Sequence, residues 1–124
     1  MKKNVVRQKS YDFALRIVET YKVLSKEKKE FVLSKQLLRS GTSIGANVEE
    51  ADSSISLAEF SAKISIAYKE ARETGYWLKL LFHSNYLEKK SFDLAFNECD
   101  EICKLLYSIL RSSGRIKVPD TSDH

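Results

Sequence analysis

The residue types that most often carry out chemistry are scarce in this chain, and their spacing fits no standard reaction centre. Its histidines are His83 and His124, and its cysteines are Cys99 and Cys103. Cysteines four residues apart form neither a redox C-x-x-C pair nor a complete zinc motif, so we expect two small buried hydrophobic side chains. A di-iron site in a helical bundle needs a glutamate followed three residues later by a histidine, and neither histidine has this neighbour.

The segment SGTSIGANVEEA at residues 40–51 contains two glycines but no phosphate-binding loop, because the glycine spacing is wrong and no strand precedes it. No histidine lies near a candidate nucleophile, which leaves hydrolase chemistry without support. We therefore predict a protein without catalytic residues, a metal or a cofactor.

The composition is typical of one globular domain. Hydrophobic residues make up 43% of the chain and charged residues 31%, and 124 residues are enough for a single core. No apolar run approaches the roughly 18–20 residues that span a bilayer, and the basic N-terminus lacks the apolar region of a secretory signal. These features predict a cytoplasmic protein with no membrane partner.

Positive charge is concentrated at the N-terminus. The formal net charge is +4, and residues 1–29 contain nine Lys or Arg against three acids. Such a basic segment suits a polyanion such as RNA or DNA, although the same imbalance also arises by chance in soluble proteins. The candidate phosphate-contacting residues are Lys2, Lys3, Arg7, Lys9, Arg16, Lys22, Lys28 and Lys29.

Apolar residues recur every three or four positions in four segments, which predicts an all-α fold. Ser56 and Glu59 form an S-x-x-E capping box, which marks the clearest helix start in the sequence. Long helices joined by short turns pack as antiparallel neighbours, so we expect an up-down-up-down four-helix bundle. The predicted helices cover residues 10–25, 29–52, 57–83 and 91–113, in one domain of residues 1–114 followed by a flexible tail at 115–124.

Gly41 and Gly45 interrupt a segment of good helix formers, and each costs a helix roughly 1 kcal/mol relative to alanine. The missing side chains would let another helix approach closely, and we expect this partner to be the 57–83 helix with its small Ala67 and Ala71. The alternative is that the glycines kink the helix or form a loop.

A polar network is predicted across the contact between the second and third helices. Its members would fix the register of the two helices, and the second interpretation is that Arg39 and Arg72 contact an anion or nucleic acid. The aromatic residues from Tyr76 to Tyr86 are expected to fill the core or an interface, with base stacking as the alternative. The predicted network residues are Arg39, Asn47, Glu50, Glu70 and Glu73.

Three motifs resemble a known family. RSGTSIGANVEEA at 39–51, EF at 59–60 and KEARETGYWL at 69–78 are similar to the small four-helix-bundle proteins encoded within intervening sequences of bacterial large-subunit (23S) ribosomal RNA genes. The resemblance implies assembly into a ring or barrel of five subunits. A related branch, the accessory variability proteins of diversity-generating retroelements, combines such a basic barrel with a reverse transcriptase and nucleic acid.

Together, the residues and the resemblance predict a non-enzymatic, homo-oligomeric scaffold, a pentamer by analogy, that binds nucleic acid through its basic surface, RNA first. The alternative is a structural or adaptor oligomer whose partner is another protein, such as a reverse transcriptase. An enzyme with an unrecognised site ranks last, because no set of acid, base and nucleophile is visible.

Overall fold

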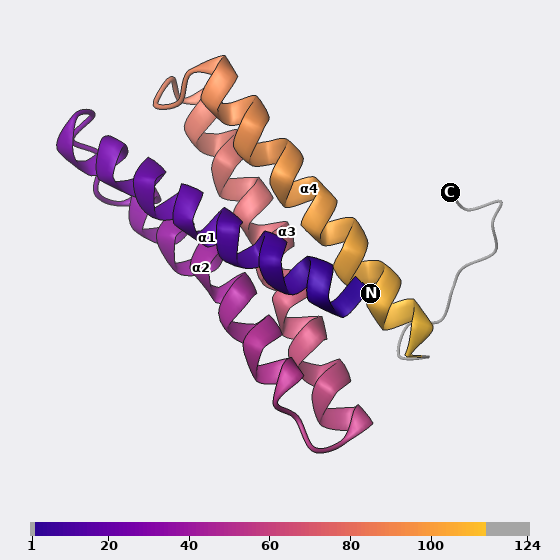
Figure 1. Cartoon of the computed structure of the whole chain (residues 1–124). Coiled ribbons are helices and arrows are strands. Elements are labelled where there is room, and N and C mark those ends of the chain that lie inside the picture. The colour runs from indigo at the N-terminus through magenta and orange to yellow at the C-terminus, as the bar shows by residue number, and fades with distance from the viewer. Residues whose placement is uncertain (1, 114–124) are drawn as a thin grey trace, which may run out of the picture.

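Four antiparallel α-helices build the fold. The structure is a computed structural model that describes residues 2–113, with side chains from residue 4 onward. Every regular element in these residues is a helix, which confirms the predicted all-α class. The turns after the first and third helices lie at one end of the bundle, and the turn after the second lies at the other (Figure 1). The helices are α1 (Lys2–Lys26), α2 (Leu33–Asp52), α3 (Leu57–His83) and α4 (Lys89–Ser112).

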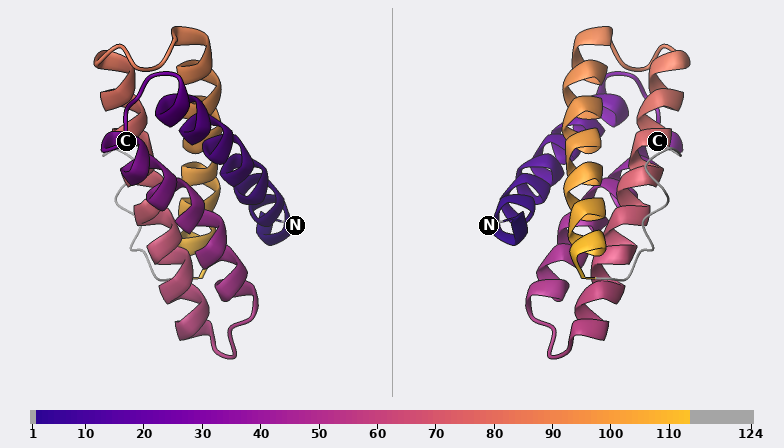
Figure 2. Two further views of the ribbon diagram at one scale, coloured as in Figure 1. Left: turned by 90° about the vertical axis from the view of Figure 1, so that its left-hand side faces the viewer. Right: turned by 90° about the vertical axis from the view of Figure 1, so that its right-hand side faces the viewer.

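The helices form a closed cycle of contacts in which α1 and α3 each pack against α2 and α4. The first helix lies at a clear angle to the α2–α3 pair, and its N-terminal end stands out from the bundle (Figure 2). One apolar stripe from each helix points into a shared core, as the three- and four-residue spacing predicts. The most deeply buried large side chains include Phe13, Ile17, Leu24, Leu37, Ile44, Ile64, Leu78, Leu81, Ile102 and Leu106.

The third helix has the bounds that the sequence predicts, because its capping residue is present. The Ser56 hydroxyl accepts a hydrogen bond from the Glu59 backbone N–H at 3.0 Å and so satisfies one of the free donors at the helix start. The fourth helix begins at Lys89, two residues before the predicted start at 91.

The first helix is longer than predicted, since it begins at Lys2 and not near residue 10. Val6 is 1% exposed and continues the buried stripe one turn beyond the buried Ser10. Because a serine interrupts the apolar pattern within the stripe, the periodicity predicted a helix that was too short. The predicted tail at 115–124 lies outside the described residues.

The second helix begins at Leu33, four residues after the predicted start at 29. Lys29 has a φ of 56°, a left-handed conformation that a continuing helix excludes. The Glu30 side chain then accepts hydrogen bonds from the backbone N–H groups that begin the helix. Phe31, which lies within the predicted 29–52 helix, precedes the observed helix and is 50% exposed.

The two glycines of α2 approach α1, and the prediction that they meet α3 is wrong. A Cβ atom on Gly41 would lie 2.9 Å from two side-chain carbons of Ile17, and one on Gly45 would lie 3.3 Å from the backbone oxygen of Ser10. Successive helix residues differ by about 100° around the axis, so Ser40 faces α3 while Gly41 faces α1. The helix continues through both glycines without a loop.

The alanines that we paired with the glycines are buried elsewhere in the core. Ala67 and Ala71 have no exposed surface, and the Ala71 backbone oxygen accepts a hydrogen bond from the Cys99 thiol of α4 at 3.1 Å. Small residues therefore occur at two different helix contacts, α1–α2 and α3–α4.

Candidate nucleic-acid interface

Three predicted basic residues of α1, Arg7, Lys9 and Arg16, already pair with carboxylates on neighbouring helices. Arg7 makes two hydrogen bonds to Glu49, at 2.6 and 3.0 Å, and pairs with Asp52 at 3.2 Å. The hydrogen bonds and charge of Arg7 lower the pKa of the Glu49 carboxyl. Arg16 holds Glu98 of α4 in the same two-point manner, at 2.6 and 3.0 Å. These arginines tie α1 to α2 and α4, so their charge is already matched within the fold.

Two of the candidate lysines are also paired. Lys9 lies 3.2 Å from a carboxylate oxygen of Glu101 on α4, and Lys22 lies 3.4 Å from Glu19 one turn earlier in α1. Both pairs are exposed, so each contributes little to stability, about 0–1 kcal/mol. Four of the eight candidate residues, Arg7, Lys9, Arg16 and Lys22, therefore already have a carboxylate partner within the fold.

Other cations remain unpaired, including two of our candidates. Lys28 and Lys29 at the α1–α2 turn have no carboxylate within ion-pair distance, whereas the side chains of Lys2 and Lys3 lie outside the described part of the chain. A free lysine or arginine can neutralise a phosphate, and the nucleic acid then releases the counterion that it held there. In residues 4–113 the lysines and arginines without a carboxylate within 4.0 Å are Lys26, Lys28, Lys29, Lys35, Lys69, Arg72, Lys79, Lys90 and Arg111.

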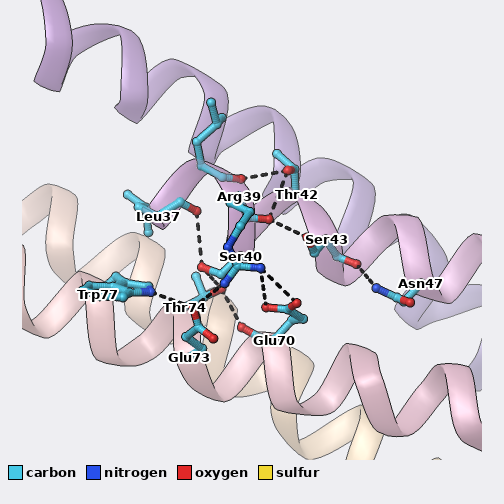
Figure 3. Close-up of polar contacts among 11 residues, drawn as sticks. Leu37, Arg39, Ser40, Thr42, Ser43, Asn47, Glu70, Glu73, Thr74 and Trp77 are labelled. Atoms are coloured by element: carbon cyan, nitrogen blue, oxygen red, sulfur yellow. Dashed lines mark hydrogen bonds and ion pairs between the residues drawn. The ribbon is translucent and has the colours of Figure 1, made fainter. Parts of the chain in front are cut away.

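The structure brings together three of the five residues predicted for the polar network. Arg39 of α2 hydrogen-bonds to both carboxylate oxygens of Glu70 on α3, at 3.2 and 3.3 Å, and to Glu73 one turn further on (Figure 3). Trp77 donates its indole N–H to Glu73 at 3.0 Å. The hydrogen bonds from Trp77 and from Arg39 lower the pKa of the Glu73 carboxyl.

A buried hydrogen bond lies beneath this network. The Thr74 hydroxyl of α3 donates to the Ser40 hydroxyl of α2 at 2.9 Å, and neither residue has exposed surface. A buried polar pair of this kind favours one register of the two helices.

Asn47 and Glu50 do not join the network, so their assignment to it is wrong. Asn47 donates to the Ser43 backbone oxygen of its own helix at 2.8 Å, and Glu50 pairs with Lys63 at 2.7 Å. Figure 3 shows Asn47 further along α2, away from Glu70. Because α2 and α3 run antiparallel, residues later in α2 meet residues earlier in α3, here Lys63 rather than Glu70.

A groove of about 1290 Å³ runs between α3 and α4, and it is the feature that our sequence analysis missed. The small residues in its lining include the buried Ala71 and Cys99 and the half-buried Gly75 and Cys103. Cys99 is the small buried side chain that we expected, and hydrogen bonding with Cys103 together with burial raises the pKa of its thiol. Cys103 is only half-buried, at the side of the groove.

Aromatic and cationic side chains form the walls of this groove. On α3 they are spaced four, four and three residues apart, from Tyr68 through Arg72 and Tyr76 to Lys79. The aromatic and cationic residues of α3 can be recognised in the sequence as a stripe beside its apolar stripe. The residues of α4 that face them can be identified only from the fold, which sets the two helices side by side. The α4 wall includes Phe96, Asp100, Lys104, Tyr107 and Arg111.

The described residues contain neither a cluster of metal-ligating side chains nor a membrane-spanning helix. No group of three His, Cys, Asp or Glu side chains there could hold a metal ion. No helix among residues 2–113 is both long and apolar enough to cross a bilayer.

Comparisons with known proteins give a family and a fold. A family model for the 23S rRNA-intervening sequence protein matches residues 2–108, and no curated protein shows a significant match. The chain is also similar to a crystal structure of a protein of unknown function from the S23 ribosomal protein family of Bacteroides thetaiotaomicron. The two share 54% sequence identity and a TM-score of 0.88, with 90% of this chain and 99% of that chain covered. Neither match names a ligand, a partner or a reaction.

Proposed function

The chain belongs to the 23S rRNA-intervening sequence protein family, and on this basis we propose that it is a non-enzymatic helical scaffold that binds nucleic acid, RNA first. The observation that carries the proposal is the distribution of ion pairs. Most described carboxylates are held by lysine or arginine, whereas exposed cations on α1, α2, α3 and α4 have no acidic partner. The surplus positive charge is thus free to meet phosphates.

The free cations form two main groups. The turn group, Lys26, Lys28, Lys29 and Lys35, surrounds the connection between α1 and α2, and all four side chains are exposed. The other group lines the α3–α4 groove. Contacts from either group to phosphates would carry no sequence information, so the proposed binding depends steeply on salt and little on sequence.

Replacing free lysines should weaken RNA binding more than replacing paired ones. We expect Lys26→Gln/Lys28→Gln to lower the affinity for RNA and to reduce the slope of log K against log salt by about 1.4, at roughly 0.7 per lost contact. The control, Lys9→Gln/Lys22→Gln, removes the same charge from lysines that already have carboxylate partners. Filter binding at several salt concentrations measures both variants. Equal slopes for the two would contradict the role of the turn group, and no binding by the wild type at low salt would refute the proposed function.

The scaffold is proposed to work as a homo-oligomer of five subunits, the number that the resemblance to the family implies. Large apolar side chains on the surface support self-association, because Val32 is 72% exposed, Ile55 93% and Leu57 64%. Light scattering tests this point: the expected mass is about five times the 14.2 kDa of one chain. A single-chain mass at micromolar concentration would contradict it.

A second candidate function is an adaptor whose partner is another protein, such as a reverse transcriptase. It is favoured by the apolar pocket of about 840 Å³ at the α2–α3 turn, which Ile55, Leu57 and Phe60 help to line. An adaptor would bind its purified partner after nuclease treatment, and Ile55→Ser/Leu57→Ser would abolish that binding. Loss of all binding on nuclease treatment would favour the nucleic-acid proposal.

A further inference from the structure

We propose that the α3–α4 groove binds a single nucleic-acid strand, holding its bases against aromatic rings and its phosphates against free cations. The inference rests on the proposed function and names the form of nucleic acid that this site accepts. It is carried by three properties of the groove: its depth, its charge and its exposed rings.

The depth of the groove comes from small residues at the contact between two long helices. Ala71 and Gly75 of α3 face Cys99 and Cys103 of α4, and all four line the groove. A Cβ atom on Gly75 would touch only Phe96, at 3.6 Å, so the space beside this glycine is open. Two helices that pack through small residues leave a trough between the larger side chains on either side.

The charge of the groove is strongly positive and largely uncompensated. Its single lining acid is Asp100, which pairs with Lys104 at 3.0 Å. Arg72, Lys79 and Arg111 line the same groove, and no described carboxylate lies within ion-pair distance of them. A polyanionic strand complements this surface, whereas an acid-poor apolar helix would leave three cations unmatched on its contact face.

The rings of the groove are placed for stacking. Tyr68 of α3 and Tyr107 of α4 contact each other in its lining, with centroids 5.9 Å apart and planes tilted by 48°, and Arg72 donates a hydrogen bond to the Tyr68 hydroxyl at 3.3 Å. Lys79 lies 5.9 Å from the centroid of the Phe96 ring. Tyr76 is 56% exposed, so a base can reach its ring without any movement of the bundle. A cationic groove with aromatic walls is the usual arrangement for single-strand binding.

The length of the groove sets the size of its ligand. From Phe96 to Arg111 the α4 wall covers about 22 Å, at roughly 1.5 Å per residue, which suits a strand of a few nucleotides. The bases of a duplex are stacked on one another and are not available to side chains, so a duplex would use only the cations. The groove should therefore prefer single strands.

The test uses the full chain and two labelled probes, a twelve-residue oligouridylate and an RNA duplex of the same length. Gly75→Leu fills the groove, and Gly75→Ala is its control, since the added methyl group fits the available space. Tyr76→Ala removes a stacking ring, and Tyr11→Ala is its control because Tyr11 is 61% exposed on α1, away from the groove. Fluorescence anisotropy gives the affinities, and circular dichroism checks that each variant keeps its helices.

We expect Gly75→Leu and Tyr76→Ala each to weaken oligouridylate binding about tenfold, with little change in duplex binding and in both controls. If both groove variants bind oligouridylate like the wild type while Lys26→Gln/Lys28→Gln binds it more weakly, the groove inference is wrong and the proposed function survives. If the wild type binds neither probe at low salt, both are wrong. If Gly75→Leu changes the mass in solution instead of the affinity, the groove holds a second copy of the chain, and the inference is again overturned.

Discussion

Gly41→Ala should lower the free energy of unfolding by up to about 2 kcal/mol, even though alanine is the better helix former. The new methyl carbon would lie 2.9 Å from two side-chain carbons of Ile17, which has no exposed surface and no room to move away. Overpacking of this kind costs about 1–3 kcal/mol, against a gain of roughly 1 kcal/mol in helix propensity. Urea denaturation at one fixed protein concentration measures the difference, since oligomer stability depends on concentration.

Gly75→Ala is the matched control for this substitution, because its methyl carbon meets one ring atom of Phe96 at 3.6 Å, an ordinary contact. It should raise the free energy of unfolding by up to about 1 kcal/mol. Ile17→Ala removes the two side-chain carbons that would clash with the methyl group of Gly41→Ala. The double variant should therefore lose less stability than the sum of the losses of the two single variants. Equal gains from both glycine variants would contradict the close approach of α1 and α2.

The helices were predictable because they depend on local patterns. The third helix shows this best, since a capping serine and a regular apolar stripe lie next to each other in the sequence, and Leu57–His83 follows from them. The start of α1 was less accessible, because Ser10 occupies a stripe position and hides the contribution of Val6. Local pattern fails where a polar side chain is buried by another helix.

The partners of each residue were less predictable because they depend on how the helices are rotated against one another. The sequence identifies Gly41 as a site of close approach. Neighbouring positions on a helix point about 100° apart, however, so the sequence does not show whether Gly41 meets α1 or α3. The same limit applies to charge. Arg16 and Glu98 are 82 positions apart, and only the folded chain shows that they neutralise each other.

The fold therefore changes which of the candidate cations are free. The sequence placed the cationic surface at the N-terminus, where the charge density is highest, but the fold matches much of that charge with acids from α2 and α4. What remains is the turn group and the α3–α4 groove. Charge counts along a sequence therefore predict that a surplus exists, whereas its location depends on which acids the fold places beside each cation.

Glu30→Ala should lower the free energy of unfolding by about 2–3 kcal/mol at pH 7, because one carboxylate closes the start of α2. Its oxygens accept from the backbone N–H groups of Val32 at 3.2 Å, Leu33 at 3.0 Å and Ser34 at 2.7 Å, and the Ser34 hydroxyl donates back to the Glu30 backbone oxygen at 2.7 Å. Glu30 is 8% exposed, so water cannot replace these contacts freely.

The loss should also depend on pH. Burial raises the pKa of Glu30, but the hydrogen bonds from the three backbone N–H groups outweigh it, and the pKa lies below the ordinary value of 4.5. A carboxyl whose pKa falls on folding stabilises the protein above that ordinary value, and its contribution disappears as the pH drops through the lowered pKa. Glu30→Ala should therefore differ from the wild type most at neutral pH and progressively less below pH 4.5. Glu27→Gln, three residues earlier and exposed, is the control and should show only a small effect on the free energy of unfolding. Urea denaturation of the three proteins across this range decides the matter: an equal deficit for Glu30→Ala at neutral and acidic pH would show that the carboxylate charge does not hold the start of α2.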